Sequence, residues 1–203
     1  IEVAKEKFFD VFLAKLRTLT NPEELEYIIL DHTEPDHSGS LGKLLELAPS
    51  ATVVGSGNAI RYLEDIMNKP FRSLVVKDGD TLDLGNLTLK FIAAPNLHWP
   101  DSIYTYLVED RVLFTCDSFG AHYCDDKMFS KLSDDYLSAF RYYFDVILKP
   151  FSKFMVKAVE KIKPLEIDVI CPGHGPVHRE HRKEIVALTE NYANEYLELI
   201  TSK

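Results

Sequence analysis

The sequence is poor in the features that mark nucleic-acid-binding and membrane proteins. Its 23 Lys and Arg residues are outnumbered by 32 Asp and Glu residues, which gives a net charge of −9. Nucleic acids and anionic membranes both reward the opposite balance. The strongest apolar runs, residues 27–30 and 146–148, are far shorter than the ~18 residues that a membrane-spanning helix needs. No basic-then-apolar start resembles a signal peptide. We therefore expect neither nucleic acid nor membrane as a partner.

Cysteine is also scarce. The three residues, Cys116, Cys124 and Cys171, are odd in number and lack C-x-x-C spacing, which argues against a disulfide scaffold and favours a reducing, cytoplasmic environment. The hydrophobic fraction of 46% and the charged fraction of 27% are those of an ordinary globular protein. At 203 residues, the chain is long enough for one good-sized domain, and we expect residues 1–203 to form it.

Apolar periodicity predicts helices and strands in alternation, followed by a run of strands. A continuous apolar run indicates a strand buried on both faces, whereas apolar residues at helical spacing indicate amphipathic helices. The expected strands span about 27–30, 52–54, 74–77, 87–93, 103–109, 112–115 and 167–171, and the expected helices about 3–19, 40–47, 58–67, 133–162 with a break at Pro150, and 179–200. This order predicts an α/β fold with helices packed on mixed sheets.

The polar loop after the first buried strand concentrates metal-binding side chains. His32, Glu34 and Asp36 occupy alternate positions, and His37 follows directly. In an extended loop, alternate residues point the same way, so three of these side chains can converge. Imidazole nitrogens and carboxylate oxygens together suit Fe, Mn or Zn better than Ca or Mg. A solvated polar turn is the alternative, and the density of the cluster favours a metal site.

Three further candidates follow later strands. His98 comes after residues 87–93, Asp117 after residues 112–115, and His174 after the last expected strand, in a stiff Pro-Gly-His-Gly-Pro turn. Ends of strands are where α/β sheets bind ligands. Seven protein ligands are too many for one ion, so the set suits two ions that share a carboxylate.

The ordered motifs resemble one family. His32-x-Glu34-x-Asp36-His37, His98, Asp117 and His174 are similar to the metal site of the metallo-β-lactamase fold, in which ordinary hydrolases carry H-x-H-x-D-H. Glu34 in the second position is the mark of the flavodiiron proteins, A-type flavoproteins that reduce dioxygen or nitric oxide. The flanking sequences H-T-E-P-D-H-S-G, D-S-F-G and C-P-G-H-G-P also resemble that family.

The resemblance implies a metallo-β-lactamase-like αββα sandwich that lacks its first strands, and it implies roles for the seven side chains. Two iron ions are expected, with zinc possible in recombinant material. One iron would be held by His32, Glu34 and His98, the other by Asp36, His37 and His174, with Asp117 bridging. No catalytic residue beyond these ligands is expected. Partners would be O2 or NO as substrate, a redox partner such as rubredoxin or a flavodoxin-like domain that binds FMN, and a second subunit in a homodimer.

Two alternatives stay open. A zinc hydrolase would use the same fold to activate water, and Glu34 argues against it. A diferrous oxygen sensor would need no flavin partner, which fits the absence of a flavodoxin-like sequence from these residues. The ligand set itself does not distinguish O2 from NO.

Side chains next to the candidate ligands have two interpretations. Trp99, Phe119, Tyr142 and Tyr143 either pack in the core or line a small apolar pocket over the metals, and His122 is a candidate hydrogen-bond donor beside a ligand. The remaining two histidines, His178 and His181, flank the start of the last expected helix, and we expect both to be solvated.

Overall fold

The computed structural model describes residues 1–202, which fall into two compact units, Ile1–Lys77 and the chain from Asp78 onward. Each unit contains a sheet, flanking helices and its own hydrophobic core. The predicted α/β class is confirmed.

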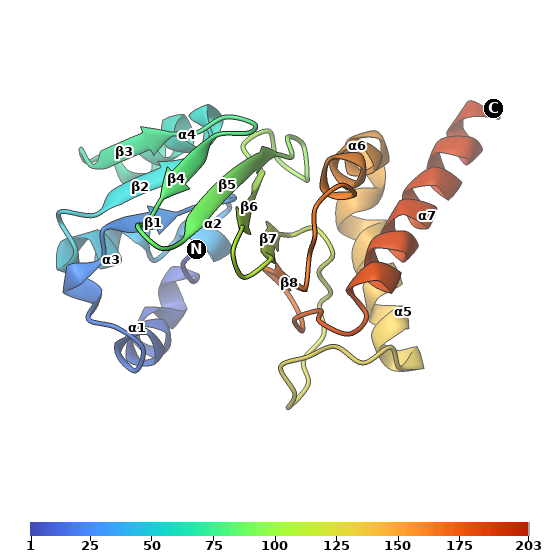
Figure 1. The fold of residues 1–203 in the computed structure, drawn as a ribbon, viewed down its shortest axis with the longest axis horizontal. Helices are drawn as coiled ribbons and strands as arrows, with labels where there is room; N and C mark the ends of the chain where they lie inside the picture. The colour runs from blue at the N-terminus through green and yellow to red at the C-terminus, as the bar shows by residue number, and fades with distance from the viewer. Residues whose placement is uncertain (203) are drawn as a thin grey trace. The chain divides into compact units, whose positions relative to one another are not determined.

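The first unit is built on a parallel sheet of three strands in the order β1-β2-β3, drawn in blue to green in Figure 1. Its elements are η1 (Glu6–Phe8), α1 (Phe9–Arg17), η2 (Pro22–Glu24), β1 (Tyr27–Ile29), α2 (Pro35–Ser38), α3 (Leu41–Leu47), β2 (Thr52–Gly55), α4 (Gly57–Met67) and β3 (Arg72–Val75). Ile28, Leu30 and Val53 are buried together with side chains of α3 and α4. The first predicted strand is therefore buried as expected, and the chain leaves it directly into the H-T-E-P-D-H motif.

The motif itself differs from the extended loop that the sequence predicted. Residues Pro35–Ser38 form the short helix α2, because Pro35 stands in its first turn and the Ser38 hydroxyl donates to the Thr33 carbonyl at 2.7 Å. The alternating geometry therefore holds only as far as Glu34. Asp36 and His37 are positioned by a helical turn instead.

Gly39 ends α2 at a place where the backbone is crowded. A Cβ atom there would lie 2.5 Å from the Pro35 carbonyl oxygen and 2.9 Å from the Glu6 backbone nitrogen. Only glycine allows η1 and α2 to approach so closely. The orientation of Asp36 and His37 consequently depends on a glycine that follows them.

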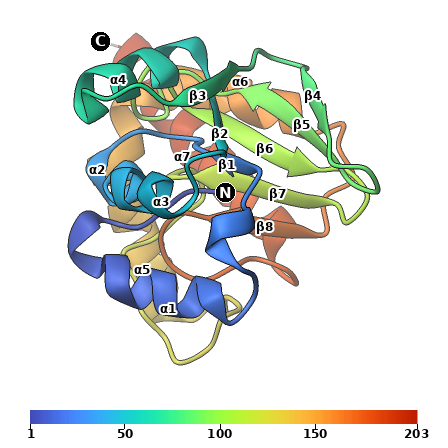
Figure 2. The same ribbon diagram turned by 90° about the vertical axis from the view of Figure 1, so that its left-hand side faces the viewer.

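The second unit contains a five-stranded sheet in the order β4-β5-β6-β7-β8, visible strand by strand in Figure 2. Its elements are β4 (Thr81–Asp83), β5 (Thr88–Ala93), β6 (Ile103–Leu107), β7 (Val112–Cys116), α5 (Asp134–Tyr143), the π-helix η3 (Phe144–Leu148), η4 (Lys149–Phe151), α6 (Ser152–Ile162), β8 (Val169–Pro172) and α7 (Arg182–Thr201). β4 to β7 pair antiparallel, whereas β8 runs parallel to β7. The ends of β7 and β8 that lead to Asp117 and His174 therefore lie at the same edge of the sheet.

The long helical segment of this unit is interrupted where the sequence predicted. The α-helix ends at Tyr143, and π-helical and 3-10 turns carry the chain past Pro150 into α6. Proline cannot donate the backbone hydrogen bond that a regular helix needs. Both arms of the interrupted helix supply buried side chains to the core of the unit, among them Phe140 and Met155.

Other element boundaries differ from the predictions. β4 was missed because its three residues carry no hydrophobic run and are mostly exposed. β3 lies at residues 72–75 rather than 74–77, in the register set by its pairing with β2. α7 begins at Arg182 rather than at residue 179, because residues 177 and 178 form β-bridges instead. No helix within residues 1–202 is long and apolar enough to cross a membrane.

Gly39→Ala is expected to lower the free energy of unfolding by roughly 1–3 kcal/mol, the usual cost of forcing extra volume into a packed site. Gly42→Ala is the matched control, because a Cβ atom there would meet only the Met67 side chain, at 3.6 Å. Gly42 lies inside α3, where alanine stabilises by about 0.4–1 kcal/mol. Urea denaturation of both variants measures the difference. Equal stability would show that the α2–η1 contact does not require glycine.

Candidate metal centre

In the first unit, the four candidate ligands form two imidazole–carboxylate pairs. His32 Nε2 lies 3.4 Å from Glu34 Oε2, and His37 Nε2 lies 3.6 Å from Asp36 Oδ2. Both histidines are buried, and the two carboxylates are partly exposed. The first pair stands in the extended segment after β1 and the second in α2. Each pair offers one nitrogen and one oxygen to a common point, which is the donor combination that iron and zinc accept.

Glu2 supports both pairs, and the sequence analysis missed it. Its Oε1 accepts hydrogen bonds from the backbone N–H groups of Asp31, at 2.6 Å, and His32, at 3.2 Å. Its Oε2 lies 2.8 Å from His37 Nδ1. A carboxylate on one ring nitrogen fixes the tautomer of the histidine and leaves the other nitrogen available to a metal. No sequence signal marks Glu2, because it lies 30 residues from the histidine whose backbone it holds.

In the second unit, one carboxylate stands between two imidazoles. His98 Nε2 lies 3.3 Å from Asp117 Oδ2, and His174 Nε2 lies 3.2 Å from Asp117 Oδ1. Asp117 is only 2% exposed. Each oxygen therefore faces a different histidine, and the separations are close to the roughly 3 Å between ligand atoms that share one ion. The structure brings all three predicted residues of this unit together.

The turn that carries Asp117 is held in an unusual backbone conformation. Cys116 and Phe119, on either side of Asp117, have φ values of +48° and +64°, which are costly for residues other than glycine. The Thr115 hydroxyl donates to the Ser118 carbonyl at 2.9 Å, and the Gly173 N–H donates to the Cys116 carbonyl at 2.5 Å. These bonds compensate for the strain and fix the direction of the carboxylate.

The segment that carries His174 is hydrogen-bonded to this turn and packs closely against it. The Ala121 N–H donates to the His174 carbonyl at 3.2 Å. Gly175 has a φ of +81°, and a Cβ atom there would lie 2.7 Å from the Ala121 carbonyl oxygen. Two segments far apart in the sequence therefore interlock through their backbones, which explains how Asp117 and His174 come together.

Aromatic rings surround the histidines of this unit. The His122 ring lies 5.4 Å from the His174 ring and 4.8 Å from the Tyr143 ring, both in edge-on contact, and the Trp99 ring lies 6.2 Å from that of His98. Phe119 is fully buried in the core, whereas Tyr142 is 65% exposed and contributes to neither the core nor the surroundings of His174. The expectation of an aromatic environment thus holds for Tyr143 and Trp99 but not for Tyr142.

The prediction that His178 is solvated is wrong. Its side chain is fully buried, with Nδ1 2.9 Å from the Ser130 hydroxyl and Nε2 2.8 Å from the Phe119 carbonyl oxygen. Burial lowers the pKa of the His178 imidazole, and the nearby His181 lowers it further. His181 is partly exposed, so it agrees better than His178 with the expectation that both histidines are solvated. Sequence reasoning placed His178 in solvent because it precedes a helix, whereas the bridge to Ile170 draws it into the core.

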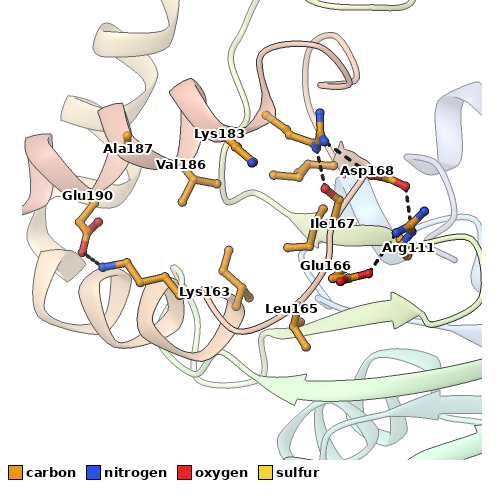
Figure 3. A pocket seen from close by; sticks show the side chains of 13 residues that line it. Arg111, Lys163, Leu165, Glu166, Ile167, Asp168, Lys183, Val186, Ala187 and Glu190 are labelled. Atoms are coloured by element: carbon orange, nitrogen blue, oxygen red, sulfur yellow. Dashed lines mark hydrogen bonds and ion pairs between the residues drawn. The ribbon is translucent and has the colours of Figure 1, made fainter.

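A cavity of about 550 Å³ lies elsewhere in the second unit, among side chains of α6, α7 and the segment that precedes β8. Figure 3 shows its charged rim, where Lys163 pairs with Glu190 at 2.6 Å and Arg111 pairs with Asp168 at 2.9 Å. Within the described residues, its lining includes none of the seven predicted ligands. The candidate metal centre is therefore the set of imidazole–carboxylate pairs and not this cavity.

Comparison with known proteins shows which proteins this chain resembles. The model of the ODP family beta lactamase matches residues 1–175. The flavo-diiron protein FprA2 of Clostridium acetobutylicum is 42% identical over 182 residues, which cover 87% of this chain and 46% of that protein. The rubredoxin oxygen:oxidoreductase of Desulfovibrio gigas has a similar structure, with a TM-score of 0.90 and 28% identity over 95% of this chain and 50% of that one.

The metal-soaked Flv1 flavodiiron core from Synechocystis sp. PCC6803 is similar too, with a TM-score of 0.90 and 32% identity over 96% of this chain and 49% of that one. These likenesses confirm the metallo-β-lactamase-like fold and the predicted resemblance. The chain spans between 32% and 46% of the length of the curated relatives that it matches.

Glu2→Ala is expected to lower the free energy of unfolding by about 1–3 kcal/mol, because two backbone N–H groups and one imidazole lose their acceptor. Glu64→Ala is the control, since Glu64 stands on the exposed face of α4 and its removal is expected to change stability by less than about 0.5 kcal/mol. Chemical denaturation compares the two. If Glu2→Ala lowered the free energy of unfolding no more than Glu64→Ala does, Glu2 would not hold these groups in place.

Proposed function

Because the chain belongs to the ODP family of β-lactamase-like proteins, we propose that it is the diiron domain of an oxidoreductase that reduces dioxygen or nitric oxide. Its similarity to flavodiiron proteins, among them one named for oxygen reduction, supports dioxygen as the first substrate to test. The activity of the whole protein is part of this proposal, because the chain spans half or less of those relatives.

The observation that carries the proposal is the position of Asp117 between two imidazoles. A carboxylate whose two oxygens face different histidines is suited to bridge two metal ions, one on each side. A buried carboxylate also needs positive charge nearby, and a bound cation supplies it. The donor set and the burial of Asp117 both fit a binuclear centre.

We assign the remaining ligands by this logic. One ion would take His32 and Glu34 with His98, and the other would take Asp36 and His37 with His174, while Asp117 bridges them. The assignment is supported by the two separate imidazole–carboxylate pairs of the first unit, one for each ion. Glu2 would hold His37 so that Nε2 faces its ion.

Glu34 favours iron as the metal. In place of a second imidazole it provides a hard carboxylate oxygen, which suits iron better than an additional nitrogen ligand would. Two ferrous ions would supply two electrons at a time. That is enough to convert two molecules of nitric oxide to nitrous oxide and water, whereas reduction of one dioxygen to water takes four electrons and needs two further electrons from a donor. The protein contributes the rigid arrangement of ligands, and Tyr143 and Trp99 contribute apolar surface beside His174 and His98.

Electrons would come from outside the described residues. We propose a flavodoxin-like domain with FMN as the immediate donor, as the family resemblance implies. A partner such as rubredoxin would come before it, in line with the name of the Desulfovibrio gigas protein. We propose a reducing compartment such as the cytoplasm, which the small, odd number of cysteines and the absence of C-x-x-C spacing support. The homodimer stays a prediction, which light scattering of the purified protein would test.

Asp117→Asn is expected to reduce the metal content from about two ions per chain to well below one, because both proposed ions lose a shared anionic ligand. His174→Ala is expected to empty mainly one site. Asp135→Asn is the control, since Asp135 is exposed in the first turn of α5 and lies outside the proposed ligands. Elemental analysis of protein made in iron-sufficient medium measures all three. Two ions retained by Asp117→Asn would refute the bridging role.

The zinc hydrolase alternative has a separate test. Reduced chemically in its iron form, the chain is expected to consume dioxygen or nitric oxide in about one turnover and to leave β-lactams and thioesters intact. Stopped-flow absorbance and hydrolysis assays on the same preparation compare the two activities. Thioester hydrolysis by the zinc form, together with an iron form that is inert to both gases, would favour the hydrolase.

A further inference from the structure

A histidine outside the proposed ligand set is buried against the turn that carries Asp117. His178 is fully buried, and its ring joins two segments, with Nε2 2.8 Å from the Phe119 carbonyl and Nδ1 2.9 Å from the Ser130 hydroxyl. A carbonyl oxygen can only accept a hydrogen bond. Nε2 must therefore carry the proton that it donates to Phe119, and the Ser130 hydroxyl donates to Nδ1.

Burial keeps this arrangement in one protonation state. The lowered pKa of the His178 imidazole favours the neutral ring, in which one nitrogen donates and the other accepts. The two partners match that pattern, because the Phe119 carbonyl accepts from one ring nitrogen and the Ser130 hydroxyl donates to the other. His178 is thus committed to a single tautomer with a single donor direction, toward Phe119.

The ring is mounted on a rigid support. The His178 N–H donates to the Ile170 carbonyl at 2.9 Å, and the Ile170 N–H donates to the His178 carbonyl at 2.8 Å. Ile170 lies in β8, the strand that leads directly to His174. The Ser130 N–H also donates to the Val177 carbonyl at 2.8 Å, so the Nδ1 partner is fixed to the same segment.

The group that His178 holds is a strained one. Phe119 is fully buried with a φ of +64°, and it lies between Asp117 and Ala121, the residue whose N–H donates to the His174 carbonyl. A non-glycine residue keeps such a conformation only when its surroundings enforce it. The bond from Nε2 to the Phe119 carbonyl is one such constraint, and it acts on the turn two residues after the shared carboxylate.

We propose that His178 is a positioning residue, which holds the Phe119 carbonyl and thereby directs the Asp117 carboxylate to its place between His98 and His174. The role of His178 rests on the proposed function, in which Asp117 bridges two ions. The ring nitrogens of His178 face Ser130 and Phe119, neither of which is a proposed ligand. Its effect passes through the backbone of the turn.

Three variants of the full 203-residue chain test the proposal, with Co²⁺ as the probe metal. His178→Gln keeps an N–H donor near the position of Nε2, His178→Asn places its amide too short to reach Phe119, and His178→Leu has no donor. We expect the affinity for Co²⁺ to fall about tenfold in the Asn and Leu variants, the lower end of what loss of a ligand's supporting partner costs. His178→Gln is expected to stay within about threefold of the wild type.

The visible absorption of bound Co²⁺ gives a readout that loss of stability alone does not change. We expect its bands to shift in the Asn and Leu variants and to return in His178→Gln. Ile185→Val is the control: it removes one methyl group from the same core, and its Co²⁺ spectrum and affinity are expected to match the wild type. Thermal denaturation shows whether each variant is folded. If the Leu variant does not fold, the comparison of His178→Gln with His178→Asn tests the positioning role by itself.

Wild-type affinity and spectrum in both His178→Asn and His178→Leu would overturn the positioning role. Failure of the proposed function looks different, because the wild-type chain itself would then bind fewer than two Co²⁺ ions. The Co²⁺ affinity and spectrum of the Gln and Asn variants could still be compared for any single ion that Asp117 binds. Failure of the proposed function can therefore be distinguished from failure of the positioning role.

Discussion

The arrangement of the second unit depends on one buried carboxylate, that of Asp117, which faces two imidazoles. Asp117 is almost wholly removed from water, and burying a charge is costly unless partners compensate for it. Two histidines from different segments, His98 and His174, supply those partners at 3.3 and 3.2 Å. Strands β7 and β8 run parallel side by side so that the turns after them can meet.

The backbone around this carboxylate is strained, and the strained conformation orients the Asp117 side chain. Positive φ values at Cys116 and Phe119 turn the chain sharply on both sides of Asp117, and hydrogen bonds from Gly173 and His178 hold the turned carbonyls. In the first unit, Glu2 plays the corresponding part, with one carboxylate oxygen on two backbone N–H groups and the other on His37. In both units, residues outside the proposed ligand set thus contact the candidate ligands or the turns that carry them.

The donors themselves limit the chemistry. Each unit presents two imidazole–carboxylate pairs, and a mixture of nitrogen and oxygen donors suits redox-active iron as well as zinc. Glu34 shifts this balance toward iron, which separates the proposed reductase from a hydrolase of the same fold. Fold alone would not make that distinction, since one scaffold supports unrelated reactions.

The sequence by itself determined the α/β class, the strand-end positions of the seven candidate ligands and the break at Pro150, because apolar periodicity, ligand spacing and proline chemistry are local properties. Tertiary structure decided what depends on distant partners. The helical turn at Asp36 and His37 depends on the packing of Gly39 against Glu6, and Glu2 reaches His37 across more than 30 positions. His178 is buried because it bridges to Ile170, and no pattern around it encodes a partner that only the folded sheet brings near.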